Sequence, residues 1–224
     1  MSHHCQDEHH EHGGHDHEHD HSDDVTPALE HSLYQHIIFD QIQTLNEESA
    51  GSGRGIVKKT WYEKNSVEPE LRSSADEQLL IEIPFTGQVK LHSILIRTGT
   101  TDSAPRTLHV FANRDDMDFA EAEDSAATQT FELPQSNDVQ ELSVKRAQFA
   151  RTRKLTLFFS DNYGDGEEDV TKILYLAFKG DWMQTGRAPT NIIYEAAANP
   201  SDHALKGTAS KKMGSDIGGG GHGF

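Results

Sequence analysis

The chain has 224 residues, 34% of them hydrophobic, and a formal net charge of −17, which fits one substantial domain diluted by polar tails. An acidic body repels nucleic acid and anionic membranes, so neither is expected as a partner. The single cysteine, Cys5, excludes an intramolecular disulfide and a CxxC redox pair, and no apolar run approaches the length of a membrane span.

A soluble monomer of the cytoplasm and nucleus is therefore expected, with a tail over 1–29, a globular domain over 30–205 and a second tail over 206–224. The first 24 residues carry eight acidic residues and no Lys or Arg. This segment has no apolar periodicity with which to offset the entropy cost of ordering, so it should be disordered. The second tail is rich in Gly and Ser and should be flexible.

The N-terminal tail also holds nine of the fifteen histidines. Alternating imidazole and carboxylate groups can bind zinc, nickel or copper, and the candidate ligands are His3, His4, His9, His10, His12, His15, His17, His19 and His21. An HExxH match at 17–21 lacks the helix that this catalytic motif needs. Two interpretations stay open: a metal-binding or metal-responsive tail, and a solubilising tail that binds metal only adventitiously. No resident cofactor is expected.

Within the globular part, residues 32–49 mix a helical stripe with strand character, and GSGRG at 51–55 predicts a mobile loop. TGQ at 86–88 predicts a hairpin. Short apolar runs bounded by turn residues predict strands without intervening helices, at 78–85, 89–96, 107–112, 130–133, 141–144, 154–159, 173–178 and 191–196. The pattern indicates an all-β protein built as an antiparallel β-sandwich or jelly roll.

Two charged segments are candidates for binding. KRAQFARTRK at 145–154 predicts either a docking site for an acidic partner or a solvated face, and its basic residues are Lys145, Arg146, Arg151, Arg153 and Lys154. DNYGDGEEDVTK at 161–172 has the acids and glycines of a calcium loop. Tyr163 and Lys172 occupy EF-hand positions that require oxygen ligands, so an EF-hand is excluded. A looser calcium site and a plain acidic turn between two strands both stay open, the possible ligands being Asp161, Asp165, Glu167, Glu168 and Asp169.

The run FFSDNYGDGEEDVTKILYLAFKGDW at 158–182 resembles the signature of the PITH domain family. Four further segments agree with this family in order along residues 32–203, namely LNEESAGSGRG, SADEQLLIEIPFTGQVKLHSILI, APRTLHVFANRDDMDF and YEAAANPSDH. The resemblance implies a jelly-roll sandwich similar to galactose-binding-like domains and association with the 26S proteasome, through its regulatory particle. The family pattern contains no catalytic residues, so the resemblance implies a non-enzymatic interaction module. Its thioredoxin-linked members carry a CxxC that this chain lacks, so redox activity does not carry over.

Candidate contacts for such a partner are the basic residues of 145–154 and three residues of the signature run, Tyr163, Asp165 and Lys172. His222, which follows four glycines in the C-terminal tail, is a candidate ligand for a zinc ion in the partner. A different class of function, a small-ligand or sugar-binding sandwich, also stays open. Trp61 and Trp182 could stack on a sugar or belong to the core.

Overall fold

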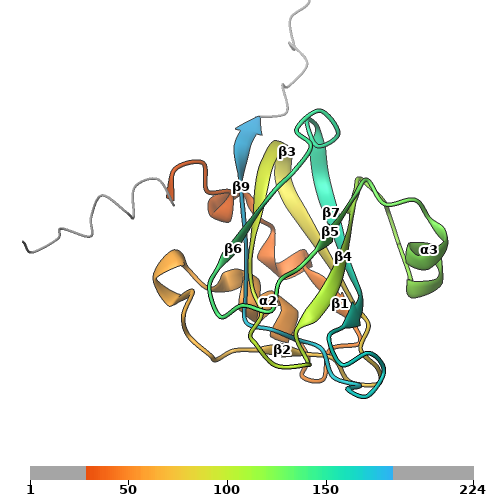
Figure 1. The fold of residues 1–224 in the computed structure, drawn as a ribbon. Helices are drawn as coiled ribbons and strands as arrows, with labels where there is room; N and C mark the ends of the chain where they lie inside the picture. Colours follow the sequence, from red (N-terminus) through yellow and green to blue (C-terminus); the bar gives the residue numbers. More distant parts are fainter. Residues whose placement is uncertain (1–28, 184–224) are drawn as a thin grey trace, which may run out of the picture. The chain divides into compact units, whose positions relative to one another are not determined.

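The computed structural model describes residues 29–183, in which all the strands pair antiparallel (Figure 1). Seven strands form one sheet system and two form a short second ladder: β1 (Gln43–Leu45), β3 (Leu79–Arg97), β4 (Pro105–Ala112), β5 (Gln129–Glu132), β6 (Gln140–Ser143), β7 (Thr152–Asn162) and β9 (Tyr175–Met183), then β2 (Leu71–Arg72) and β8 (Lys172–Ile173). The predicted all-β antiparallel sandwich is confirmed. The predictions for both tails and for a strand at 191–196 lie outside the described residues.

The prediction of a hairpin at 86–88 is wrong, because β3 is one continuous strand of 19 residues. Its first half pairs with β7 and β1, and its second half pairs with β9 and β6. The register with β7 shifts between Pro84 and Val89, so the strand passes from one layer to the other instead of reversing. Gly87 allows a close approach there, since a Cβ on it would lie 2.8 Å from Nε1 of Trp182.

The prediction of a mobile loop at 51–55 is also wrong, because GSGRG begins helix α2 (Ser52–Lys58). The carboxylate of Glu47 accepts hydrogen bonds from the backbone N–H of Gly51 at 2.5 Å and of Gly53 at 2.9 Å. These acceptors satisfy donors that a helix N-terminus leaves unpaired. On its other side the helix buries Ile56 and Val57 in the core.

The remaining helices are short. Residues 32–49, for which the sequence left helix and strand both open, form the 3₁₀ turns η1 (Tyr34–His36) and η2 (Phe39–Gln41), followed by the strand β1. A third 3₁₀ turn, η3 (Trp61–Glu63), follows α2. Helix α3 (Phe119–Asp124) lies between β4 and β5, so the prediction of strands without intervening helices is wrong at this connection. The side chain of Asp118 caps α3 by accepting the N–H of Glu121 at 2.8 Å. None of the helices within residues 29–183 is long and apolar enough to cross a bilayer.

Two apolar clusters hold the sandwich together. The larger lies between the layers and includes the fully buried rings of Phe149, Phe159 and Phe178. The smaller lies under α3, where Phe158 packs with Phe111. Because neighbouring residues on a strand face opposite ways, β7 supplies one ring to each cluster. This explains why two phenylalanines are adjacent at 158 and 159.

Candidate functional site

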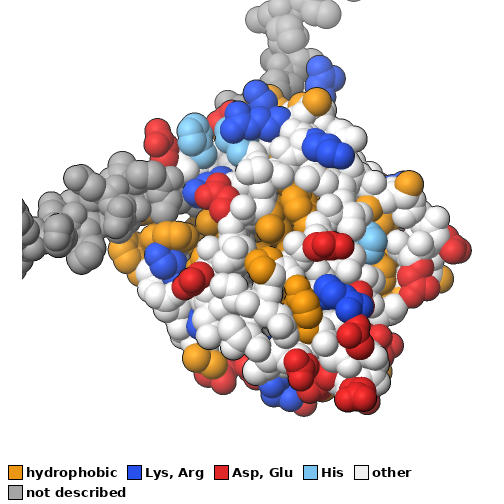
Figure 2. Space-filling view, in the orientation of Figure 1, with side chains coloured by type: hydrophobic (Ala, Val, Ile, Leu, Met, Phe, Trp, Pro, Cys, Tyr) orange, Lys and Arg blue, Asp and Glu red, His pale blue; other side chains and the backbone are white. Residues whose placement is uncertain are grey.

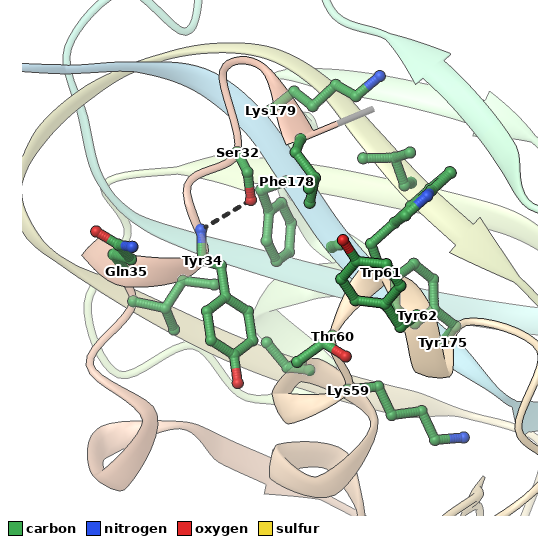
Figure 3. Close-up of a pocket in the computed structure, with 15 residues that line it drawn as sticks. Ser32, Tyr34, Gln35, Lys59, Thr60, Trp61, Tyr62, Tyr175, Phe178 and Lys179 are labelled. Atoms are coloured by element: carbon green, nitrogen blue, oxygen red, sulfur yellow. Dashed lines mark hydrogen bonds between the residues drawn. The ribbon is translucent and has the colours of Figure 1, made fainter. Parts of the chain in front are cut away.

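A pocket of about 460 Å³ opens on one face of β9 (Figure 3). Four segments that are distant in the sequence build it: the segment before β1, the end of α2 with η3, β3 and β9 itself. The lining residues are Leu29, Ser32, Tyr34, Gln35, Ile37, Val57, Lys59, Thr60, Trp61, Tyr62, Leu95, Tyr175, Ala177, Phe178 and Lys179. Its volume falls within the range of natural ligand pockets.

Strand geometry explains how β9 contributes the floor. Tyr175, Ala177 and Lys179 alternate along the strand and so point to the same face. The segment before β1 lies along β9, because the backbone N–H of Leu33 donates to the carbonyl of Phe178 at 2.9 Å and Ser32 forms a β-bridge with Lys179. These contacts place the segment's side chains over the alternating face and close one wall of the pocket.

Five of the fifteen lining residues are aromatic, and Figure 3 shows the labelled rings of Tyr34, Tyr175 and Phe178 around the cavity. The hydroxyl of Tyr34 donates to the carbonyl of Lys58 at 2.9 Å, which fixes its ring. Trp61 is half-buried in the wall and carries the ammonium group of a neighbouring lysine over its ring. Tyr62 is 75% exposed at the rim, so it is free to contact a partner.

Burial shifts the pKa of two groups in the pocket. The ammonium group of Lys59 donates to the carbonyls of Ser66 at 2.9 Å and Leu174 at 2.7 Å. Burial, with the nearby charge of Arg97, lowers the pKa of Lys59 below its usual value. Burial also raises the pKa of Tyr175 from its ordinary 10.0 to about 12. The arrangement is suited to holding an apolar or aromatic group.

Hydrogen bonds of the Arg106 and Tyr163 side chains stabilise the acidic loop of the signature run. Arg106 donates to the carboxylate of Asp161 through Nε at 3.1 Å and Nη2 at 2.9 Å, and through Nη1 to Asp165. The hydroxyl of Tyr163 donates to the carbonyl of Leu133. The plain acidic turn, rather than a calcium site, is therefore the interpretation that these contacts favour, because the guanidinium of Arg106 already pairs with both aspartates.

Lys172, the third predicted partner contact of the signature run, lies in β8 opposite Arg72. Its backbone N–H donates to the carbonyl of Ser103 at 2.8 Å. The signature loop therefore ties β7, β4 and β8 together. A separate hollow at the loop is lined by Asp102, Tyr163, Gly164, Asp165, Glu167 and Glu168. Its walls are mainly acidic, in contrast to the aromatic pocket.

The basic run divides into two parts. The ammonium group of Lys154 lies 3.2 Å from a carboxylate oxygen of Glu82 and 3.4 Å from one of Asp115, so it is an internal ion-pair residue. The other four, Lys145, Arg146, Arg151 and Arg153, are exposed around the β6–β7 turn. Phe149 anchors this turn, since its ring is fully buried and its carbonyl accepts the N–H of Leu91 at 3.1 Å.

The sequence prediction and the structure therefore select different surfaces. None of the pocket residues was among the predicted partner contacts, although Thr60-Trp61-Tyr62 offered a signal as two adjacent aromatics outside any predicted strand. Trp182, the other tryptophan considered for a sugar site, is 37% exposed and stacks on His36 with ring centroids 4.6 Å apart. The predicted tail ligands and His222 lie outside the described residues.

Comparison with known proteins identifies relatives along most of the chain. The PITH domain family profile matches residues 23–198. PITH domain-containing protein 1 of Mus musculus is 37% identical over 182 residues, covering 80% of this chain and 83% of that protein. The Xenopus laevis protein of the same name is 38% identical over 186 residues, covering 82% and 87%.

Solved structures add a likeness of fold. The CBM32-1 and CBM32-2 domains of Clostridium perfringens ZmpB superpose with a TM-score of 0.52 at 12% identity, covering 71% of this chain and 38% of that one. This confirms the expected galactose-binding-like sandwich. At such low identity the likeness concerns the fold alone and carries no ligand with it.

Proposed function

The chain belongs to the PITH domain family, and we propose that it acts as a non-enzymatic interaction module that associates with the 26S proteasome in the cytoplasm and nucleus. The family resemblance supports the partner and its regulatory particle as the docking site. The aromatic pocket supports the mode of binding: it is the observation that carries this proposal. A monomer is the proposed free form.

The pocket has the features of a protein-binding hot spot. Hot spots are enriched in Trp and Tyr around a centre that excludes water, and here Trp61 and Tyr62 stand beside an apolar cavity. The proposed occupant is an apolar or aromatic side chain of the partner. It would pack against the buried Tyr175 and Phe178.

The polar groups of the pocket support a binding role over a catalytic one, because they are engaged in structural contacts. The hydroxyl of Ser32 accepts the N–H of Tyr34 at 3.4 Å. Thr60 and Glu63 form a reciprocal cap at the start of η3. The ammonium group of Lys59 donates to two carbonyls. The hydroxyl of Thr60 also donates to the carboxylate of Glu63 at 2.9 Å, and this contact belongs to the same cap.

Co-purification of the tagged full-length chain with intact proteasomes, at near-native abundance, tests the proposal. Tyr62→Ser should weaken association about tenfold or more, the effect of losing one hot-spot ring. Because Tyr62 is 75% exposed, the substitution should leave the fold intact. Val67→Ser is the matched control, since Val67 is 57% exposed and lies outside the pocket lining.

Failure of the unmodified chain to associate with proteasomes would refute the proposed partner. The Tyr62→Ser variant could associate fully with proteasomes while an Arg151→Ala/Arg153→Ala variant does not. That result would refute the pocket as the docking site and assign docking to the β6–β7 turn.

A further inference from the structure

Three side chains with metal-binding atoms converge at the C-terminal end of β9. Nδ1 of His31 lies 3.0 Å from Oδ1 of Asp181, and Nε2 of His92 lies 3.1 Å from Oδ2 of the same carboxylate. The three potential ligand atoms all lie within 4.8 Å of one another. Figure 2 shows histidine side chains beside Lys and Arg side chains at this end of the sandwich.

A β-bulge in β3 directs the side chain of His92 toward Asp181. In the pairing of β3 with β9, Leu91 is opposite Gly180 and Ser93 is opposite Lys179, which leaves His92 as the extra residue. A bulge redirects the side chain of its extra residue and is common beside functional sites. The carbonyl of His92 accepts the N–H of Val144 at 3.0 Å, which holds the bulge in place.

The backbone of His31 is held just as closely. Its carbonyl accepts the N–H of Gly180 at 2.7 Å, the residue immediately before Asp181. His31 has a φ of 63°, a left-handed conformation that few non-glycine residues adopt. Two separate backbone features, a bulge and a left-handed residue, therefore present imidazoles to one carboxylate.

The partners of Asp181 distinguish it from the other aspartates already described. Asp161 is neutralised by Arg106, but the ion-pair partners of Asp181 within residues 29–183 are the two histidines. Lys90 is opposite Asp181 in the strand register, yet no ion pair joins these two described residues. The carboxylate is thus grouped with two imidazoles, the ligand types that zinc takes in proteins.

We propose that His31, His92 and Asp181 form a zinc-binding site with an open fourth position. At zinc–nitrogen distances of roughly 2.0–2.1 Å, tetrahedral ligand atoms lie about 3.3 Å apart. Here the two imidazole nitrogens lie 3.0 and 3.1 Å from different oxygens of Asp181, and the ligand atoms of the three residues lie within 4.8 Å of one another. His31 makes the remaining adjustment, because its side chain is 53% exposed and can rotate. Two nitrogens and one carboxylate favour zinc over calcium or magnesium, which take oxygen ligands.

Three protein ligands leave the fourth zinc position for water or for a side chain from a partner, as in zinc sites that exchange a ligand. This distinguishes the site from a closed structural zinc centre. It is also independent of the N-terminal histidines, since all three ligands belong to the folded domain.

The test uses the full-length chain with the nine histidines of residues 1–24 replaced by glutamine, so that the tail cannot mask the site. Competition with a chromophoric chelator should detect one zinc ion per chain. His92→Gln and Asp181→Asn, each in this background, should weaken zinc binding at least about 100-fold, since loss even of an outer partner of a ligand costs about 10–100-fold. His109→Gln is the matched control, because Nδ1 of His109 lies 3.1 Å from Oγ1 of Thr130, which belongs to the neighbouring strand β5.

Circular dichroism of the zinc-free variants checks that each one folds. His31→Gln provides a third variant at an exposed position, should a substitution in the strands disturb the sandwich. Cobalt(II) absorption provides a second readout: the parent should show the intense visible bands of a four-coordinate site, and Asp181→Asn should lose them. The proposal is overturned if the parent binds no zinc at micromolar concentration, or if the folded His92, Asp181 and His31 variants bind it as tightly as the parent.

Discussion

Replacing Glu47 with alanine removes the carboxylate that caps helix α2. The side chain is part-buried, and its two oxygens accept the backbone N–H of Gly51 at 2.5 Å, the N–H of Gly53 at 2.9 Å and the hydroxyl of Ser52 at 3.2 Å. Without it, two backbone donors at the helix start lose their partner within the protein. The negative charge at the positive end of the helix is lost as well.

The expected cost follows from these contacts. A helix cap contributes about 0.5–2 kcal/mol, and hydrogen bonds to a charged group about 1.5–3 kcal/mol each, without full additivity. Because Glu47 accepts two capping bonds and one from a hydroxyl, the Glu47→Ala change should lower the free energy of unfolding by roughly 3 kcal/mol. Glu47→Gln keeps one oxygen acceptor but no charge, so its cost should be roughly half as large.

Urea denaturation followed by circular dichroism measures both changes. With a denaturant slope of about 2 kcal/mol per molar, Glu47→Ala should move the midpoint down by roughly 1.5 M. Glu48→Ala is the control on the adjacent residue, whose carboxylate pairs with Arg72 at 2.9 Å but is 54% exposed, so it should cost about 0–1 kcal/mol. Equal costs for Glu47→Ala and Glu48→Ala would refute the cap and restore the mobile loop predicted for 51–55.

Three further outcomes are expected. Gly180→Ala should destabilise the fold by about 1–3 kcal/mol in the same urea assay, because the added Cβ would lie 2.4 Å from the carbonyl oxygen of Lys90. An unchanged midpoint would show that β9 and β3 can move apart at no cost in stability. The raised pKa of Tyr175, about 12 against an ordinary 10.0, means that between these values the unfolded chain loses a proton that the folded chain keeps. Roughly 2–3 kcal/mol of stability should therefore be present below pH 10 and lost as the pH rises through about 12, and Tyr175→Phe should remove that loss in urea titrations across this range. Calcium at millimolar concentration should leave the melting temperature unchanged, since Arg106 already neutralises Asp161. A rise in the melting temperature with calcium would instead support a calcium site in the acidic loop.

The strands that the sequence predicted correctly have local causes. Alternation in Leu155, Leu157 and Phe159 reflects one buried face of β7. The apolar run at 173–178 is divided between β8, which ends at Ile173, and β9, which begins at Tyr175 and pairs with β3. The wrong predictions at 51–55 and 86–88 have tertiary causes. Gly51 to Gly55 begin a helix because the carboxylate of Glu47 accepts hydrogen bonds from the N–H groups at its start. Thr86-Gly87-Gln88 has the composition of a turn, but its glycine makes room for Trp182, which lies almost a hundred positions later.

The difference between local and tertiary causes also explains why the sequence predicted the family but not the pocket. The signature run is a contiguous stretch with a recognisable order of residues. The pocket comes from four separate segments, so no single stretch of the sequence predicts it, and the adjacent aromatics Trp61 and Tyr62 were its only local signal. The zinc ligands depend on a bulge at His92 and a left-handed residue at His31, neither of which has a distinctive composition.

The pocket and the proposed zinc site share two structural elements. Asp181 continues the alternating face of β9 on which Tyr175 lines the pocket. The segment that carries His31 continues directly into Ser32 and Tyr34, which form a wall of the pocket. Zinc bound between His31 and Asp181 would therefore fix this wall against β9, and a fixed wall reduces the ordering cost of binding a partner. Any strengthening of partner association by zinc should accordingly vanish in Asp181→Asn, while the zinc-free affinity of that variant stays unchanged.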